Sequence, residues 1–176
     1  MAIPELCTAR LILRAPIPDD AAQIFSRYAQ DPEVTRYLIW SPHKSVSETE
    51  EFIERCIAES AGGVRFPWVI TGKSTRELIG MIELQIHAGD ANVGYVIARS
   101  EWGRGYVTEA LRGVLDFAFS RPDVKRVWAV CDVANIASAR VMEKAGMLRE
   151  ALVPSFIRHP NISEALRDVY RYAVNR

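Results

Sequence analysis

Cysteine and histidine are scarce in this chain. Three of its 176 residues are histidine and three are cysteine, namely Cys7, Cys56 and Cys131. The cysteines are widely spaced and form no Cys-x-x-Cys pair, which argues against a structural metal site. Their odd number also argues against a disulfide framework, so a reducing compartment is expected.

The chain also lacks net charge and long apolar runs. Acidic and basic residues number 22 each, which disfavours binding to nucleic acid through bulk positive charge, although a local basic patch stays possible. No apolar stretch approaches the roughly 20 residues that span a bilayer, and the N-terminal segment does not resemble a signal peptide. We therefore expect a soluble cytoplasmic protein.

Repeats, low-complexity tracts and linker-like stretches are absent as well. Hydrophobic residues make up 49% of the chain and charged residues 25%, an ordinary balance for a globular protein. A chain of this size buries roughly 70% of its unfolded surface, so it needs no disulfide or metal site to be stable. The sequence therefore predicts one domain, residues 1–176.

Hydrophobic periodicity predicts an alternation of strands and helices. Val107 to Ala118 carry the apolar face of one helix, and a second helix is capped by Asn135 and ends near Gly146. The other expected elements are a strand at 8–14, helices at 20–30 and 45–60, strands at 66–71, 77–87, 91–97 and 125–131, and two strands within 147–174. Early hairpins followed by helical crossovers favour a mixed sheet.

A glycine-containing loop, residues 102–108, joins a strand to a helix. Free backbone N–H groups and the helix dipole at such a junction favour an anion, for example a phosphate. The loop is not a P-loop, and Thr108 replaces the third glycine of a dinucleotide fingerprint. Taken alone, the loop is a weak signal, and a glycine turn that simply starts a helix is the more common interpretation.

Taken together, several segments resemble the GCN5-related N-acetyltransferase (GNAT) superfamily. The resemblance is closest to the RimJ/RimL-type branch, which acetylates N-termini of ribosomal proteins. It rests on Thr8-x-Arg10-Leu11-x-Leu13-Arg14, Asp31-Pro32-Glu33-Val34, Gly94-Tyr95, the loop and helix start at 102–110, Asn135-x-x-Ser138-x-Arg140, Glu143-Lys144-x-Gly146-Met147 and residues 167–173.

The resemblance implies a GNAT-like fold of the mixed α/β class. Its mainly antiparallel sheet would have seven strands, with splayed fourth and fifth strands at 91–97 and 125–131, and about four flanking helices. Gly94 would supply a bulge at the opening.

The resemblance also implies a site for acetyl-CoA and no metal. Main-chain groups of Tyr95, Val96 and Ile97 would pair with the pantetheine arm, and Asn135 and Ser138 would contact the arm near the sulfur. The pyrophosphate loop would comprise Trp102, Gly103, Arg104, Gly105, Tyr106, Val107 and Thr108.

Two residues are candidates for catalysis. Ser138 would hydrogen-bond to the leaving sulfur or protonate it, or it could be a first-turn helix serine that satisfies a local backbone group. Met142 occupies the position where many relatives carry a tyrosine acid, so that role is vacant. Glu83 could act as a base through water, or it could be a solvated charge. His159 is a suitable residue type but is expected to lie in a turn, and Cys131 is expected in the core. The base is left open.

The sequence thus predicts an acetyl-CoA-dependent N-acetyltransferase in which a primary amine attacks the thioester directly. The acceptor would be a protein N-terminus or a small-molecule amine, with no nucleic acid or membrane partner and possibly a homodimer. The alternative is a weakly active CoA-binding sensor or interaction module on the same fold.

Overall fold

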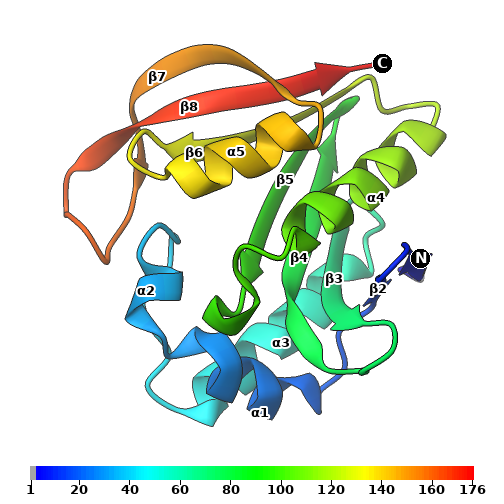
Figure 1. Ribbon diagram of the computed structural model, residues 1–176, viewed down its shortest axis with the longest axis vertical. Helices are drawn as coiled ribbons and strands as arrows, with labels where there is room; N and C mark the ends of the chain where they lie inside the picture. Colours follow the sequence, from blue (N-terminus) through cyan, green and yellow to red (C-terminus); the bar gives the residue numbers. More distant parts are fainter. Residues whose placement is uncertain (1–2) are drawn as a thin grey trace.

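Eight strands form one open sheet in the computed structural model, which describes residues 3–176 (Figure 1). Their order is β1-β2-β3-β4-β5-β6-β8-β7, and every neighbouring pair is antiparallel except β5 and β6. The strands are β1 (Leu6–Cys7), β2 (Leu11–Arg14), β3 (Arg65–Gly72), β4 (Leu78–His87), β5 (Asp90–Ile97), β6 (Arg126–Asp132), β7 (Leu148–Arg158) and β8 (Leu166–Asn175).

Helices cover both faces of the central strands (Figure 1). The α-helices are α1 (Asp20–Ile24), α2 (Pro32–Thr35), α3 (Val46–Ser60), α4 (Tyr106–Ser120) and α5 (Ile136–Lys144). A π-helical turn, η1 (Phe25–Ala29), continues α1, and a 3₁₀ turn, η2 (Arg99–Glu101), follows β5. The mixed α/β fold predicted from the sequence is confirmed.

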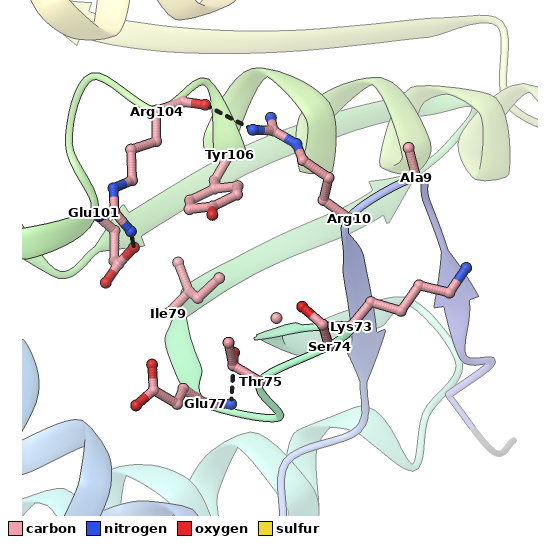
Figure 2. A pocket seen from close by; sticks show the side chains of 11 residues that line it. Ala9, Arg10, Lys73, Ser74, Thr75, Glu77, Ile79, Glu101, Arg104 and Tyr106 are labelled. Carbon is pink, nitrogen blue, oxygen red and sulfur yellow. Dashed lines mark hydrogen bonds and ion pairs between the residues drawn. The ribbon is translucent and has the colours of Figure 1, made fainter.

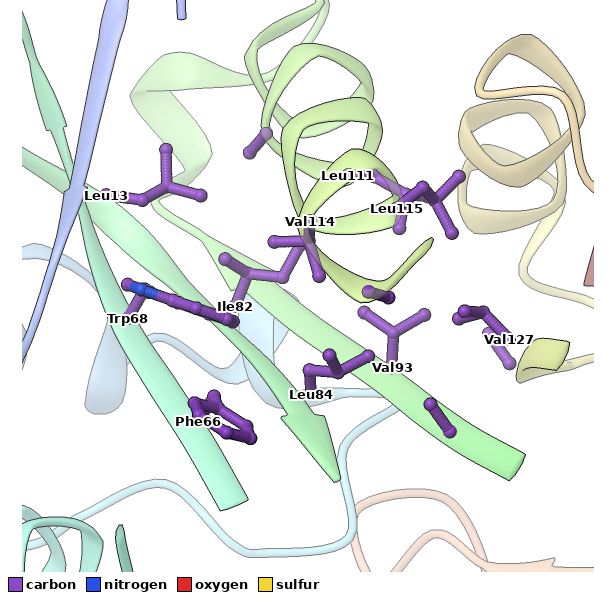
Figure 3. Close-up of a cluster of buried hydrophobic side chains, with 14 of the residues drawn as sticks. Leu13, Phe66, Trp68, Ile82, Leu84, Val93, Leu111, Val114, Leu115 and Val127 are labelled. Carbon is purple, nitrogen blue, oxygen red and sulfur yellow. The ribbon is translucent and has the colours of Figure 1, made fainter. Parts of the chain in front are cut away.

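The main core lies between the sheet and α4 (Figure 3). Trp68, Ile82 and Val93 project from neighbouring strands toward Leu111 and Val114, and all five are almost fully buried. A second core packs the opposite face against α1 and α3. With both faces covered, β3 is buried along nearly its whole length rather than alternating with solvent.

The element boundaries correct three details of the sequence prediction. The sheet has eight strands rather than seven, because Leu6–Cys7 form an additional strand, β1, before the predicted strand at 8–14. Residues 8–10, predicted as the start of that strand, form a turn between β1 and β2. In that turn the Thr8 N–H donates to the Leu11 carbonyl at 3.0 Å. The short helix α2 is a further addition, capped by the Asp31 carboxylate, which accepts from the Glu33 N–H at 2.9 Å.

The third correction concerns Gly94, because the predicted bulge is absent. Pairing of β5 with β4 runs without a register shift from His87–Asp90 to Gly80–Ile97. The turn between these strands contains Ala88 and Gly89, both with positive φ, as a tight hairpin requires.

The two parallel strands separate after three residue pairs. β5 and β6 pair only from Asp90–Arg126 to Asn92–Trp128. At the last pair the Asn92 side-chain amide donates to the Trp128 carbonyl at 3.3 Å. The opening between the strands therefore arises from where the parallel ladder ends, and not from a bulge in β5.

Candidate functional site

A groove of about 1310 Å³ occupies the opening between β5 and β6. It is bounded by the glycine loop, the first turns of α4 and α5, and the segment that contains α2 and the residues after it. A cavity of about 340 Å³ lies beside the same loop and shares Arg10 and Tyr106 with the groove (Figure 2).

The glycine loop leaves the start of α4 open toward the groove. Gly103 and Gly105 have φ values of 76° and 79°, which strain residues with a side chain, and no protein atom would lie within 4 Å of a Cβ at Gly103. Gly105 is the N-cap and provides no side-chain hydrogen bond, whereas α3 and α5 are capped by Ser45 and Asn135. The unpaired N–H groups and the dipole of α4 thus face a space that an anion can enter.

Arg10 holds the loop from the side of β2. Its guanidinium donates to the Arg104 carbonyl at 3.1 Å and lies over the ring of Tyr106, 4.6 Å from the centroid (Figure 2). Glu109, in the first turn of α4, accepts from Arg10 Nε at 2.7 Å and from the Thr8 hydroxyl at 2.6 Å. These contacts fix the loop relative to the sheet.

The free edge of β5 faces the groove. The Ala98 N–H donates to the Ile79 carbonyl of β4 at 2.9 Å, so by the alternation of an antiparallel ladder Ile97 and Tyr95 direct their main-chain groups away from β4. The Trp102 indole donates to the Ile97 carbonyl at 3.1 Å. Main-chain groups on this edge beyond Asn92 have no partner strand.

Two hydroxyl groups meet across the opening. Tyr95 Oη of β5 lies 2.8 Å from Ser138 Oγ and 3.2 Å from the Ser138 carbonyl oxygen, in the first turn of α5. The Asn135 side chain caps this helix by accepting from the Ser138 N–H at 3.2 Å. Burial raises the pKa of Tyr95 well above its usual range, although its bond with Ser138 opposes the shift. The phenol is therefore neutral at physiological pH.

The other end of the groove is lined by residues from distant parts of the chain. Tyr37 and Trp40 follow α2, and His159 follows β7. The Asn161 amide ties these segments together by donating to the Thr35 and Trp40 carbonyls at 2.7 and 2.8 Å. His159 is only 3% exposed, and its Nδ1 lies 3.4 Å from the Leu38 carbonyl.

Asp132, at the end of β6, is the buried carboxylate of this region. It accepts from Arg167 Nη2 at 3.1 Å and from the Ala134 N–H at 2.9 Å, and its Oδ2 lies 3.7 Å from His159 Nε2. Burial raises the pKa of Asp132, but the hydrogen bonds from Arg167 and Ala134 and the nearby positive charge outweigh this and lower it. The carboxylate is thus ionised and fully engaged.

Comparison with known proteins identifies the fold and the family. Residues 10–148 match the acetyltransferase (GNAT) domain family. The chain belongs to this family. The uncharacterized N-acetyltransferase YoaA of Bacillus subtilis is 33% identical over 159 residues, which cover 88% of each chain. The predicted family and enzyme class, an N-acetyltransferase, are therefore confirmed.

Solved acetyltransferases share the whole architecture. The Salmonella typhimurium enzyme described as modifying the N-terminal serine of ribosomal protein L7/L12 superposes with a TM-score of 0.86 at 20% identity, covering 98% of this chain and 99% of that one. Spermidine N-acetyltransferase from Vibrio cholerae, solved with CoA and spermine, gives 0.78 at 22% identity over 94% and 95%. At 20% and 22% sequence identity, these similarities show that the fold is shared and nothing more specific.

The acetyltransferase structure brings most of the predicted site residues together. The groove is lined by Tyr95, Val96, Ile97, Trp102, Gly103, Gly105, Tyr106, Val107, Thr108, Asn135 and Ser138. Arg104 lines the adjoining cavity. Glu83 lies outside the lining of both, and its carboxylate accepts from Arg65 Nε at 2.8 Å.

Several residues of the site escaped the sequence analysis. The Tyr95 hydroxyl was missed because 43 residues separate it from Ser138, and no local pattern links the two. The Asp132–Arg167 ion pair was missed for the same reason. His159 lies in the connection after β7, as expected, and its burial against the groove had no signal in the sequence.

Residues 3–176 offer neither a metal-binding cluster nor a helix suited to crossing a membrane. That part of the chain contains no group of three or more His, Cys, Asp or Glu side chains placed to hold a metal ion. None of its helices combines the length and apolar character needed to cross a membrane.

Proposed function

We propose that this N-acetyltransferase binds acetyl-CoA in the groove between β5 and β6 and acetylates a single primary amine, with an α-amine as the preferred acceptor. The observation that carries the proposal is that three features line one groove: the open start of α4, the free edge of β5, and the hydroxyl pair formed by Tyr95 of β5 and Ser138 of α5. A cytoplasmic location and a homodimer stay predictions.

The donor substrate fits the groove in three parts. The pyrophosphate would accept hydrogen bonds from loop and helix N–H groups between Gly103 and Thr108. The pantetheine amides would pair with the free edge of β5 at Tyr95 and Ile97, while Val96 would contribute side-chain contact. The thioester sulfur would then reach Ser138 beside Asn135.

The acceptor would enter from the end lined by Tyr37, Trp40 and His159. Arg36, a cation, also lines this end, and the carboxylate of Asp132 is already engaged by Arg167. A polyamine needs several free carboxylates for its additional ammonium groups, whereas this end adds to Asp132 one exposed acidic residue, Glu33, which Arg36 offsets. One amine on a partly apolar substituent, such as the N-terminus of a peptide, fits better.

An acceptor of this kind can be acetylated without a strong catalytic base in the protein. An α-amino group loses its proton near pH 8, so an appreciable fraction is neutral at physiological pH. The amine nitrogen attacks the thioester carbon, the C–N bond forms, and the C–S bond breaks with its electron pair moving to sulfur. Water would accept the proton from nitrogen, with positioning by the groove supplying much of the rate. Catalysis by Glu83 would have to operate through water from outside the groove.

A turnover assay tests this function. CoA release from acetyl-CoA would be followed by mass spectrometry with peptides that have free N-termini, with the same peptides blocked at the N-terminus, and with spermidine. We expect acetylation of the free N-termini and none of the blocked peptides. If no amine causes CoA release, the proposed acetyl transfer is refuted and the CoA-binding module is favoured. If spermidine is the preferred acceptor, the proposed preference for an α-amine is refuted.

A further inference from the structure

Tyr95 and Ser138 form a hydroxyl pair whose protons can be arranged in two ways. In the first arrangement, the Ser138 hydroxyl donates to Tyr95 Oη at 2.8 Å, and the phenol donates to the Ser138 carbonyl oxygen at 3.2 Å. In the second, Tyr95 donates to Ser138 Oγ, and the serine proton is free to point elsewhere. Both arrangements use the same heavy-atom positions.

The first arrangement suits the groove without a substrate. Both hydroxyl protons then have acceptors within the protein, so neither half-buried group is left unpaired. The second arrangement suits a groove that holds a sulfur atom near Ser138. The serine proton then points to the sulfur, while Tyr95 satisfies the serine oxygen.

Burial keeps the phenol in its neutral form. Since burial raises the pKa of Tyr95, transfer of its proton to the leaving group is disfavoured, but donation of a hydrogen bond is not. A phenol of this kind can orient and polarise a neighbouring hydroxyl group throughout the reaction. Met142, deep in the core at 0% exposure, leaves no second hydroxyl at the expected tyrosine position.

The geometry points to Tyr95 as the positioning residue that turns the Ser138 hydroxyl toward the departing sulfur. This inference rests on the proposed acetyl transfer. As the C–S bond breaks, the electron pair moves to sulfur and the thiolate accepts a hydrogen bond from Ser138, whose oxygen accepts from Tyr95. The proton lost from the amine reaches sulfur through water, so serine and tyrosine both end in their starting protonation states.

The alternative is a brace that merely joins β5 to α5. A brace would affect folding and cofactor affinity, but it would not act specifically on the sulfur. Tyr172→Phe is the matched control, because Tyr172 is 1% exposed, its hydroxyl bonds to Glu143 of α5 at 2.9 Å, and it does not line the groove.

The first experiment measures kcat in a double-mutant cycle. Tyr95→Phe is expected to lower kcat on the order of 10-fold with little change in the Kd for CoA, as expected for one lost hydrogen bond. In a Ser138→Ala background the same change is expected to have no further effect, and in Ser138→Thr, which keeps the hydroxyl, the loss should reappear. Equal losses in the wild-type and Ser138→Ala backgrounds, or an unchanged kcat in Tyr95→Phe, would overturn the inference.

The second experiment needs no turnover. The thiol of bound CoA is titrated through its thiolate absorbance, with the complex of desulfo-CoA as the blank. Tyr95→Phe and Ser138→Ala are each expected to shift this titration to higher pH, and Tyr172→Phe is expected to leave it in place. Coincident titrations for wild type and Tyr95→Phe would overturn the inference. If the wild type acetylates no amine, the proposed function fails while this titration still decides the role of Tyr95.

Discussion

Arg10 and Glu109 are 99 residues apart in sequence and form the contact that joins the turn before β2 to the start of α4. The arginine donates to the carboxylate twice, from its main-chain N–H and from Nε, each at 2.7 Å. The same guanidinium holds the Arg104 carbonyl of the glycine loop. The loop that would receive the pyrophosphate is thus anchored through one glutamate.

Glu109→Gln tests this anchor through the pH dependence of stability. Burial raises the pKa of Glu109, but the hydrogen bonds from Thr8 and Arg10 outweigh it and lower the pKa below its ordinary value. The carboxylate therefore stabilises the fold above the unfolded-state pKa of about 4.3, and this contribution is lost as pH falls through the lower folded-state value. Glu109→Gln should lower the free energy of unfolding by roughly 1–2 kcal/mol at pH 7. Below pH 5 its free energy of unfolding should fall less steeply with decreasing pH than that of the wild type.

Urea titrations between pH 3 and pH 7 measure both effects. Glu54→Gln is the control, because Glu54 is an exposed residue on α3. Its free energy of unfolding is expected to fall with decreasing pH as steeply as that of the wild type. An equally steep fall in Glu109→Gln would show that this carboxylate does not carry the predicted contribution.

Gly103→Ala should separate loop strain from donor binding. A residue with a β-carbon at φ 76° lowers the stability of the fold by about 1–2 kcal/mol. The added methyl group would meet no protein atom within 4 Å. Gly146→Ala is the matched control, since Gly146 has φ 97°, an equally open Cβ position and no place in the groove. Thermal melts should show similar losses for both variants.

CoA titration then distinguishes the two glycines. Gly103→Ala is expected to weaken CoA binding by about 10-fold or more, because the methyl group enters the proposed pyrophosphate position. Gly146→Ala should retain the wild-type Kd. Equal affinities in the two variants would place the pyrophosphate elsewhere.

The parts of the fold with local signals were predictable. Residues 45–60 carry a serine cap and a helical apolar stripe, and α3 begins after Ser45 as expected. The hydrophobic periodicity likewise predicted a strand at 77–87, which is β4, and its antiparallel partner at 91–97, which is β5. In each case the deciding interactions lie within one element or between sequence neighbours.

The missed features depend on tertiary geometry. Glu83 has the alternating pattern of an exposed strand residue, but whether it reaches the groove depends on the face it shares with Arg65. The opening beside Tyr95 depends on where the β5–β6 ladder ends, and that register is set by packing of the whole sheet. Local residue patterns and the family resemblance therefore singled out the glycine loop that lines the groove, but not the Tyr95–Ser138 hydroxyl pair.

The three thiols should differ sharply in reactivity. Cys7 is exposed, whereas Cys56 and Cys131 are buried, and burial raises the pKa of both buried thiols to about 11. A disulfide reagent at pH 8 should modify one thiol rapidly and the other two only after denaturation, because the thiolate is the reactive form. Cys7→Ser should abolish the rapid phase. Rapid modification of Cys131 would instead reveal a reactive thiol in the groove.

Trp102 should report donor binding. Its side chain is 48% exposed, lines the groove and donates to the Ile97 carbonyl, on the β5 edge proposed to receive pantetheine. CoA is therefore expected to change the tryptophan fluorescence, and Trp102→Phe should remove most of this change. Trp128→Phe is the control, because Trp128 lies on β6 outside the groove lining. Full retention of the signal in Trp102→Phe, with loss in Trp128→Phe, would mean that CoA approaches β6 from another side and that the β5 edge is not its partner.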